Sequence, residues 1–155
     1  MERKDIFDVV RDFFALLNSP NTSEDEFENV RALVRVLDDL ARAYHFVIYE
    51  FDGQANDPPA HDLQLYSAMR NLAGSKFPTL GDYSTVDPLE VPTSEILTGD
   101  ALDDIADIAC DLQDVLWCLE NTSESNALFH FQIRYDSHWG RHLRYLQVYL
   151  YEILH

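Results

Sequence analysis

The stretch from Asp100 to Trp117 constrains the fold more than any other part of this sequence. At about 100° per residue, a helix over this stretch has one apolar face and an opposite face that carries only carboxylates. The apolar positions are Leu102, Ile105, Ala109, Leu112, Leu116 and Leu119, and the carboxylates are Asp100, Asp103, Asp104, Asp107, Asp111 and Asp114. The sequence therefore predicts one helix with a core face and an unusually pure acidic face.

Apolar residues recur at helical spacing in most of the remaining chain, which has 155 residues and a hydrophobic content of 46%. This is enough for one compact core, so we expect a single domain over residues 1–155. The other expected helices cover residues 5–18, 23–50, 62–73, 128–136 and 138–154. Ser23, with Glu26 three residues later, is the expected N-cap of the second helix. The predicted fold class is all-α, a bundle of about five to six helices.

Two segments need a separate argument. Residues 128–136 alternate between apolar and polar side chains as a strand would, but a lone strand has no sheet to join in a helical chain, so we expect a helix. Residues 75–99 contain three prolines and two glycines, which exclude a long helix. Their many apolar side chains are too numerous for a free linker. We therefore expect 75–99 to be a long ordered loop that wraps against the bundle.

The charge of the chain is strongly uneven. The formal net charge is −17, and residues 77–133 carry 12 acidic side chains without one Lys or Arg. Such a field attracts basic proteins and repels both phosphate backbones and anionic membranes. We expect a basic protein partner, with no direct nucleic-acid or membrane contact.

The cysteines and the N-terminus bear on the compartment. Cys110 and Cys118 lie eight residues apart on the predicted acidic helix, about 12 Å along its axis, which is too far for a disulfide. Met1 to Asp5 lacks the apolar core of a signal peptide, and the longest apolar runs are interrupted by charge. These features predict a cytoplasmic protein with free thiols.

A second distinctive cluster runs from His138 to His142 and reads His-Trp-Gly-Arg-His. The two histidines lie at i and i+4 on one helical face, so they could bind one metal ion together with Asp107 and Asp111 from the acidic helix. The Glu-x-x-His pattern of di-iron bundles is absent, and histidines often hydrogen-bond carboxylates instead. We therefore favour a structural His–Asp network over a metal site and expect no cofactor.

Other chemistry has little support in the sequence. There is no Gly-x-Ser-x-Gly elbow and no Gly-rich phosphate loop. The acidic neighbours of Cys110 would raise the pKa of its thiol and make it a poor nucleophile. Trp117 and Trp139 are expected to flank the junction of the two clusters as core anchors.

Three stretches together resemble the domain of unknown function 5063 family. They are 77–83 (FPTLGDY), 99–117 with its repeated aspartates, and 138–143 (HWGRHL). The order and spacing of three motifs are more specific than any one alone. The resemblance implies an all-helical bacterial cytosolic domain whose signature is the Asp/Trp helix and the His-Trp-Gly-Arg-His helix. It implies no activity.

These features lead to a functional expectation and two alternatives. We expect a non-catalytic interaction module, immunity-like or adaptor-like, that engages a basic partner through the helix 100–117. The candidate binding residues are Asp103, Asp104, Asp107, Asp111, Asp114, Trp117, His138, Trp139 and His142. One alternative is a metal-dependent helical-bundle enzyme that uses His138 and His142 with Asp107 and Asp111. The other is a protein whose acidic face mimics DNA phosphates.

The aspartates of the acidic helix divide into two groups. Those in its first turn, Asp100, Asp103 and Asp104, are explained by the positive end of the helix dipole. Like charges at i, i+4 spacing destabilise a helix mildly, so Asp107, Asp111 and Asp114 need partners or open solvent. The expected partners are Arg31, Arg35, His138 and His142.

Overall fold

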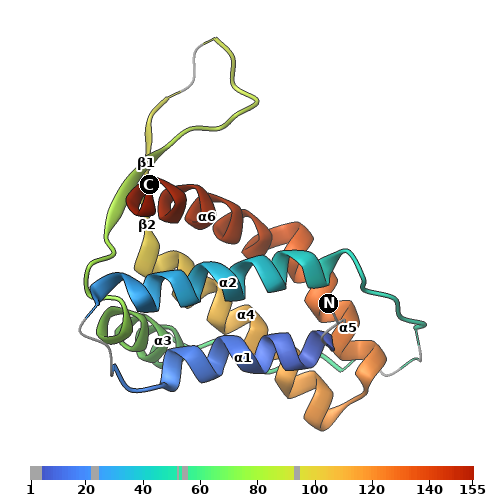
Figure 1. The fold of residues 1–155 in the computed structure, drawn as a ribbon. Coiled ribbons are helices and arrows are strands. Elements are labelled where there is room, and N and C mark those ends of the chain that lie inside the picture. Colours follow the sequence, from blue (N-terminus) through green and yellow to red (C-terminus); the bar gives the residue numbers. More distant parts are fainter. Residues whose placement is uncertain (1–4, 22–24, 52, 54–55, 93–94) are drawn as a thin grey trace.

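The computed structural model describes residues 5–21, 25–51, 53, 56–92 and 95–155. Ser23, the expected N-cap of the second helix, lies outside these ranges. The described elements are α1 (Ile6–Asn18), α2 (Glu26–Tyr44), α3 (Leu63–Lys76), β1 (Asp82–Thr85), β2 (Leu97–Asp100), α4 (Ala101–Asn121), α5 (Glu124–Arg134), the π-helical turn η1 (Tyr135–Trp139) and α6 (Gly140–Leu154). Helices dominate and the sheet has only two short strands (Figure 1). The all-α bundle is therefore confirmed.

Aspartate side chains begin the first four helices. Asp5 caps α1, Asp62 caps α3 and Asp100 caps α4, each by accepting a hydrogen bond from a backbone N–H of the first turn. Asp25 does the same for α2, through the N–H of Phe27. The second helix ends at Tyr44, so the expected end near Glu50 is wrong. The residues after it are aromatic and β-branched, and such side chains favour a helix less.

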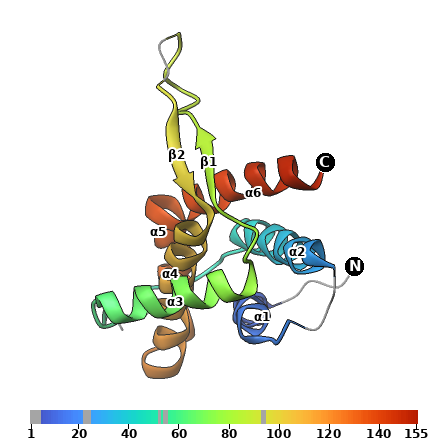
Figure 2. The same ribbon diagram turned by 90° about the vertical axis from the view of Figure 1, so that its left-hand side faces the viewer.

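The acidic helix α4 is the centre of the bundle. It contacts α1, α3, α5 and α6, while α2 contacts α1 and α6 (Figure 2). The fully buried positions on its apolar face include Ala101, Ile105, Ile108, Ala109, Leu112 and Val115. Of the predicted core face, Ile105, Ala109 and Leu112 are fully buried. The other three predicted positions pack against the core but remain partly exposed: Leu102, Leu116 and Leu119. None of the helices in the described part of the chain combines the length and the apolar content that a bilayer crossing requires.

The segment 75–99 forms a hairpin rather than a loop that wraps the bundle. Strands β1 and β2 pair in antiparallel register, with Tyr83 opposite Gly99. A Cβ at Gly99 would lie inside the Tyr83 ring, so only glycine permits this pairing. Phe77 and Leu80 are buried as expected. The expectation is wrong for the far end of the hairpin, which projects away from the helices (Figures 1 and 2) and exposes most of Leu89 (89%).

The chain from Glu124 to Leu154 is helical throughout. The helical expectation for 128–136 is confirmed, although the local pattern alternates like a strand. The last helix does not simply begin at His138, because a π-helical turn joins α5 to α6. The turn brings the carbonyl oxygen of Tyr135 to 2.5 Å from where a Cβ at Gly140 would lie. Glycine is therefore required where the π turn returns to α-helix.

Candidate functional site

The acidic face of α4 is largely covered by the rest of the chain. Asp104, Asp111 and Asp114 are only 5%, 2% and 4% exposed. Asp103 and Asp107 remain partly exposed. Burying a carboxylate without a partner is costly, and each of the three buried ones has partners from other elements. Most of the expected docking face is therefore an internal polar layer.

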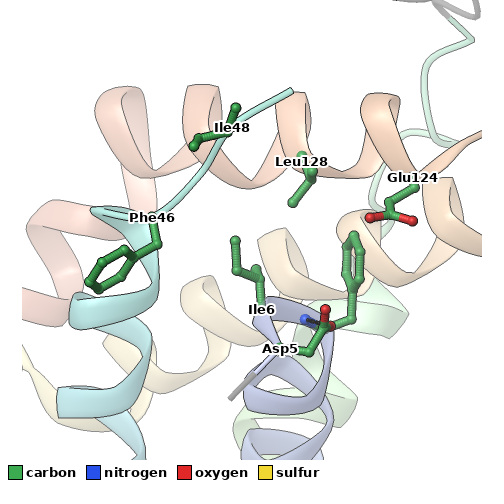
Figure 3. A pocket seen from close by; sticks show the side chains of 7 residues that line it. Asp5, Ile6, Phe46, Ile48, Glu124 and Leu128 are labelled. Atoms are coloured by element: carbon green, nitrogen blue, oxygen red, sulfur yellow. Dashed lines mark hydrogen bonds between the residues drawn. The ribbon is translucent and has the colours of Figure 1, made fainter. Parts of the chain in front are cut away.

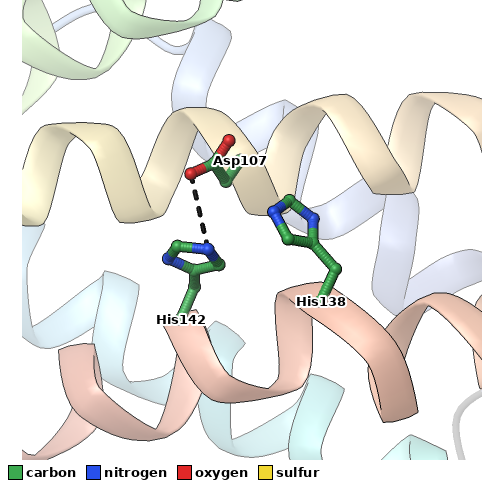
Figure 4. A group of neighbouring side chains, drawn as sticks. All are labelled: Asp107, His138 and His142. Atoms are coloured by element: carbon green, nitrogen blue, oxygen red, sulfur yellow. Dashed lines mark ion pairs between the residues drawn. The ribbon is translucent and has the colours of Figure 1, made fainter.

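His138 and His142 meet this layer from η1 and α6 (Figure 4). Nδ1 of His138 lies 2.6 Å from Oδ2 of Asp111, and Nδ1 of His142 lies 2.7 Å from Oδ1 of Asp104. Nε2 of His142 lies 3.5 Å from Oδ2 of Asp107. The structure thus brings the His-Trp-Gly-Arg-His motif into contact with the aspartate-rich helix. The spacing of the histidines and of the aspartates predicted this contact.

The hydrogen bonds define which ring nitrogens face the shared space. A carboxylate accepts hydrogen bonds, so Nδ1–H of each histidine donates to its buried aspartate. This orientation leaves Nε2 of both rings for another partner. One ligand atom each from Asp107, His138 and His142 lies within 4.8 Å of the other two. The arrangement is a cation-binding geometry in which Asp104 and Asp111 orient the ligands from behind.

The electrostatics of the cluster favour a proton or a cation at its centre. The hydrogen bond to Asp104 raises the pKa of His142, although partial burial opposes this, and the charge of Asp107 adds to it. Burial raises the pKa of Asp107 above its usual range despite the two histidines. Solvent still reaches the three groups, because the side chains of Asp107, His142 and His138 are 27%, 28% and 45% exposed.

A second group lies further along α4, and its histidine and arginine were not predicted. Nε2 of His61 lies 2.8 Å from Oδ1 of Asp114. Nη2 of Arg134 lies 3.4 Å from Asp114, and its Nη1 lies 3.7 Å from Asp111. His61, Asp111 and Asp114 also meet within 4.8 Å, but the guanidinium supplies a positive charge that competes with a cation there. Asp111 therefore contacts this second group and also orients His138. It does not join Asp107 in one ligand set, contrary to the expectation.

The first turn of α4 is tied to α3 and the hairpin. Asp103 accepts hydrogen bonds from the Tyr66 hydroxyl and from Nε of Arg70 (2.7 Å), and Arg70 also pairs with Asp100 at 2.5 Å. Asp104 accepts a hydrogen bond from the Tyr83 hydroxyl. The helix dipole alone therefore does not account for these acids, contrary to the expectation.

The expected arginine partners lie elsewhere. Arg31 pairs with Asp25 (2.8 Å) and with Glu28 (3.7 Å), both at the start of its own helix. Arg35 pairs with Glu28 at 3.4 Å. Helix geometry gives each arginine a nearer acid on its own surface. The prediction that Arg31 and Arg35 reach the acidic helix is wrong.

The two tryptophans have different positions. Trp139 is fully buried, and its ring packs against Phe131 and Tyr135 with centroids 5.1 and 4.9 Å away. It is a core anchor and has no surface for a partner. Trp117 is partly buried and lines a cavity of about 210 Å³ together with His61 and other residues.

The sequence holds only a weak signal for the missed residues. His61 follows the Pro58-Pro59 pair in a loop, and nothing in its neighbourhood marks a partner on α4. Arg134 is the first base after the 57-residue block without Lys or Arg. Its place directly after that block is the one hint that it pairs with the acids.

A further cavity of about 300 Å³ lies between the start of α1, the chain after α2 and α5 (Figure 3). Its lining residues are Asp5, Ile6, Phe7, Phe46, Ile48, Glu124 and Leu128. The carboxylate of Asp5 is already engaged in the helix cap. The cavity therefore offers Glu124 and apolar surface, and it does not resemble a catalytic or metal site.

Comparisons with known proteins bear on the family and the fold. No curated protein matches the chain. The structure is similar to the crystal structure of protein BF1032 from Bacteroides fragilis, with a TM-score of 0.74 and 19% sequence identity over 97% of this chain and 90% of that one. This likeness extends to the fold alone. The model of the family described as "Domain of unknown function (DUF5063)" matches residues 2–155. The chain therefore belongs to this family, as the three motifs predicted.

Proposed function

We propose that this protein binds one divalent transition-metal ion between α4 and the turn from η1 into α6, with Asp107, His138 and His142 as ligands. Two imidazoles with one carboxylate suit zinc, iron, manganese and similar ions. Two ligand atoms bound to one tetrahedral ion at about 2.1 Å lie about 3.4 Å apart. The separation of 3.5 Å between His142 Nε2 and Asp107 Oδ2 fits this requirement.

The single observation that carries the proposal is the pair of buried aspartates behind the histidines. Metal-binding histidines usually donate their other N–H to a carboxylate, which fixes the ring and increases its basicity. Asp111 and Asp104 stand in this relation to His138 and His142. A purely structural network would be complete with these two hydrogen bonds. Here Nε2 of His142 also lies 3.5 Å from a further carboxylate, Asp107, and a ligand atom of His138 lies within 4.8 Å of both.

Three protein ligands leave at least one coordination position for water or a substrate, as in catalytic metal sites. Partial exposure of all three side chains gives solvent access to that position. When bound, the ion would supply Lewis-acid chemistry or an activated water. The function best supported is therefore metal-dependent chemistry in a helical bundle. Asp111 and Asp104 act as positioning residues in this proposal.

The test measures metal content and affinity. Protein purified without chelator is expected to contain about one ion per chain, and calorimetric titration of the stripped protein with Zn²⁺, Mn²⁺ and Fe²⁺ should show saturable binding. His142→Ala and His138→Ala should abolish it, whereas His155→Ala, at an exposed histidine, should not. Affinity should fall on acidification because the ion must displace a proton from His142. Absence of saturable binding with every ion, in folded protein, would refute the proposal.

Docking of a basic protein on α4 is a second candidate, favoured by the block 77–133 without Lys or Arg. Only Asp103 and Asp107 of the five candidate carboxylates keep substantial exposure. Charge reversal at these two positions should therefore lower the affinity for a captured partner, and high salt should lower it as well. Binding that survives both changes would contradict it. A DNA mimic gains no support, because three of the carboxylates it would present are buried.

A further inference from the structure

The hairpin end and α6 form a surface that the proposed metal site does not use. The described residues 86–92 and 95–96 carry three acids, Asp87, Glu90 and Glu95, and no Lys or Arg. We call these described residues the arm. Leu89, Val91 and Ile96 of the arm are each at least three-quarters exposed. Exposed apolar side chains gathered on one projecting element mark an interaction site.

A groove lies at the base of this arm. It has a volume of about 540 Å³ and lies between one wall formed by β1 with the start of the arm and a second wall formed by α6. The α6 wall consists of Arg144, Tyr145, Val148, Tyr149 and Glu152. Stacking of Tyr83 on Tyr149, with centroids 4.8 Å apart, holds the two walls together. The groove is therefore a preformed feature with apolar walls.

The charges beside the groove indicate its occupant. Within the part of the chain that the structure describes, Arg141 and Arg144 of α6 form no ion pair with a carboxylate. Arg144 donates only to the Tyr135 hydroxyl and to Gln147. Arg42 of α2 also forms no ion pair among the described residues, but its guanidinium lies over the Phe46 ring, whereas Arg144 lines the groove. Glu152 lines the groove one helical turn beyond Val148, so the positive charge lies at the Arg144 end. The apolar walls and the arginine at this end suit an occupant that is both apolar and acidic.

We propose that the occupant is the arm of a second copy of this chain. The arm has the required composition, with Leu89 and Val91 for the apolar groove and acids on either side for the arginines. Each copy carries both the arm and the groove, so two reciprocal contacts close a two-fold dimer. A two-stranded hairpin is marginally stable alone, and the partner's α6 would supply the packing that its far end lacks.

Sedimentation equilibrium and light scattering test this dimer. Wild-type protein is expected to dimerise, and either an arm variant, Leu89→Ser with Val91→Ser, or a groove variant, Val148→Asp with Arg144→Glu, should shift it to monomer. The controls are Leu63→Ser and Tyr151→Ser, which remove exposed apolar side chains outside the arm and the groove. Both should remain dimeric. All replaced side chains are solvent-exposed, so circular dichroism should be unchanged.

Mixing the variants distinguishes arm–groove exchange from a generic sticky surface. An arm variant retains a wild-type groove and a groove variant retains a wild-type arm, so a mixture restores one of the two contacts. Heterodimer formation from two monomeric variants is the expected result. A monomeric wild type, a dimer insensitive to both variants, or a mixture that stays monomeric would each overturn the proposal. The proposal would also be overturned if the arm variant lost the binding of a different protein while the oligomeric state of the chain stayed the same.

Discussion

Replacing Asp104 by alanine tests whether the buried polar layer stabilises the bundle. Asp104 is almost fully buried and accepts hydrogen bonds from Nδ1 of His142 (2.7 Å) and from the Tyr83 hydroxyl. Hydrogen bonds to a charged group contribute about 1.5–3 kcal/mol each. Removing one partner of a buried charged pair costs about 3–5 kcal/mol. We expect Asp104→Ala to lower the free energy of unfolding by about 3–5 kcal/mol.

Chemical denaturation measures this loss. The midpoint should fall while the slope with denaturant stays unchanged, because the folded and unfolded surfaces are nearly the same. The thermal midpoint should fall by roughly 10 °C for a chain of this size. Glu120→Ala is the matched control, since it removes one carboxylate from the exposed side of the same helix. Its effect should stay within about 0.5 kcal/mol.

The pH dependence of the loss identifies His142 as the partner. The pKa of His142 is raised in the folded state, chiefly by its hydrogen bond to Asp104. The stabilisation from this shift is fully present below the unfolded pKa of about 6.5 and is lost as pH rises through the folded pKa. In protein stripped of metal, where His142 is free to take up a proton, Asp104→Ala should therefore cost more at pH 6 than at pH 9. A cost under about 1 kcal/mol, or one that grows with pH, would refute this account of Asp104.

Three further outcomes follow from local geometry. Gly140→Ala should destabilise the protein by about 1–3 kcal/mol in urea unfolding, because its Cβ meets the Tyr135 carbonyl; an unchanged midpoint would contradict the close approach. Cys110 and Cys118 should resist alkylation at pH 8 until unfolded, because burial and nearby acids raise both thiol pKa values to about 11. Ser123→Ala should cost about 1 kcal/mol by loss of the α5 cap, and an effect near zero would argue against that hydrogen bond.

The helices were predictable where apolar spacing and capping residues agree. The periodicity of residues 100–119 correctly predicts helix α4 and the centre of its core face. The i, i+4 spacing of His138 and His142 correctly places both on the side that meets α4. The end of α2 was misplaced because its apolar pattern continues past Tyr44 into residues of low helix preference. The hairpin was missed because two four-residue strands separated by a long arm leave little local signal.

The partners of the acidic face were only partly predictable. Spacing indicates which side chains share a helix face, but not which distant residue packs against that face. Arg70, on α3, reaches Asp100 and Asp103, whereas Arg31 meets acids on its own helix. Both are arginines on helices, and the packing of the bundle decides which acids each one reaches.

The sequence by itself determined the class of fold, the family, the central helix and the meeting of the aspartate and histidine motifs, because all of these depend on periodic local patterns. Tertiary structure alone decided that Asp104, Asp111 and Asp114 are buried. From the sequence alone, a helix face made only of acidic residues is expected to be exposed to solvent. It becomes internal here because His61, Arg134, His138 and His142 come from four other segments and satisfy each buried carboxylate.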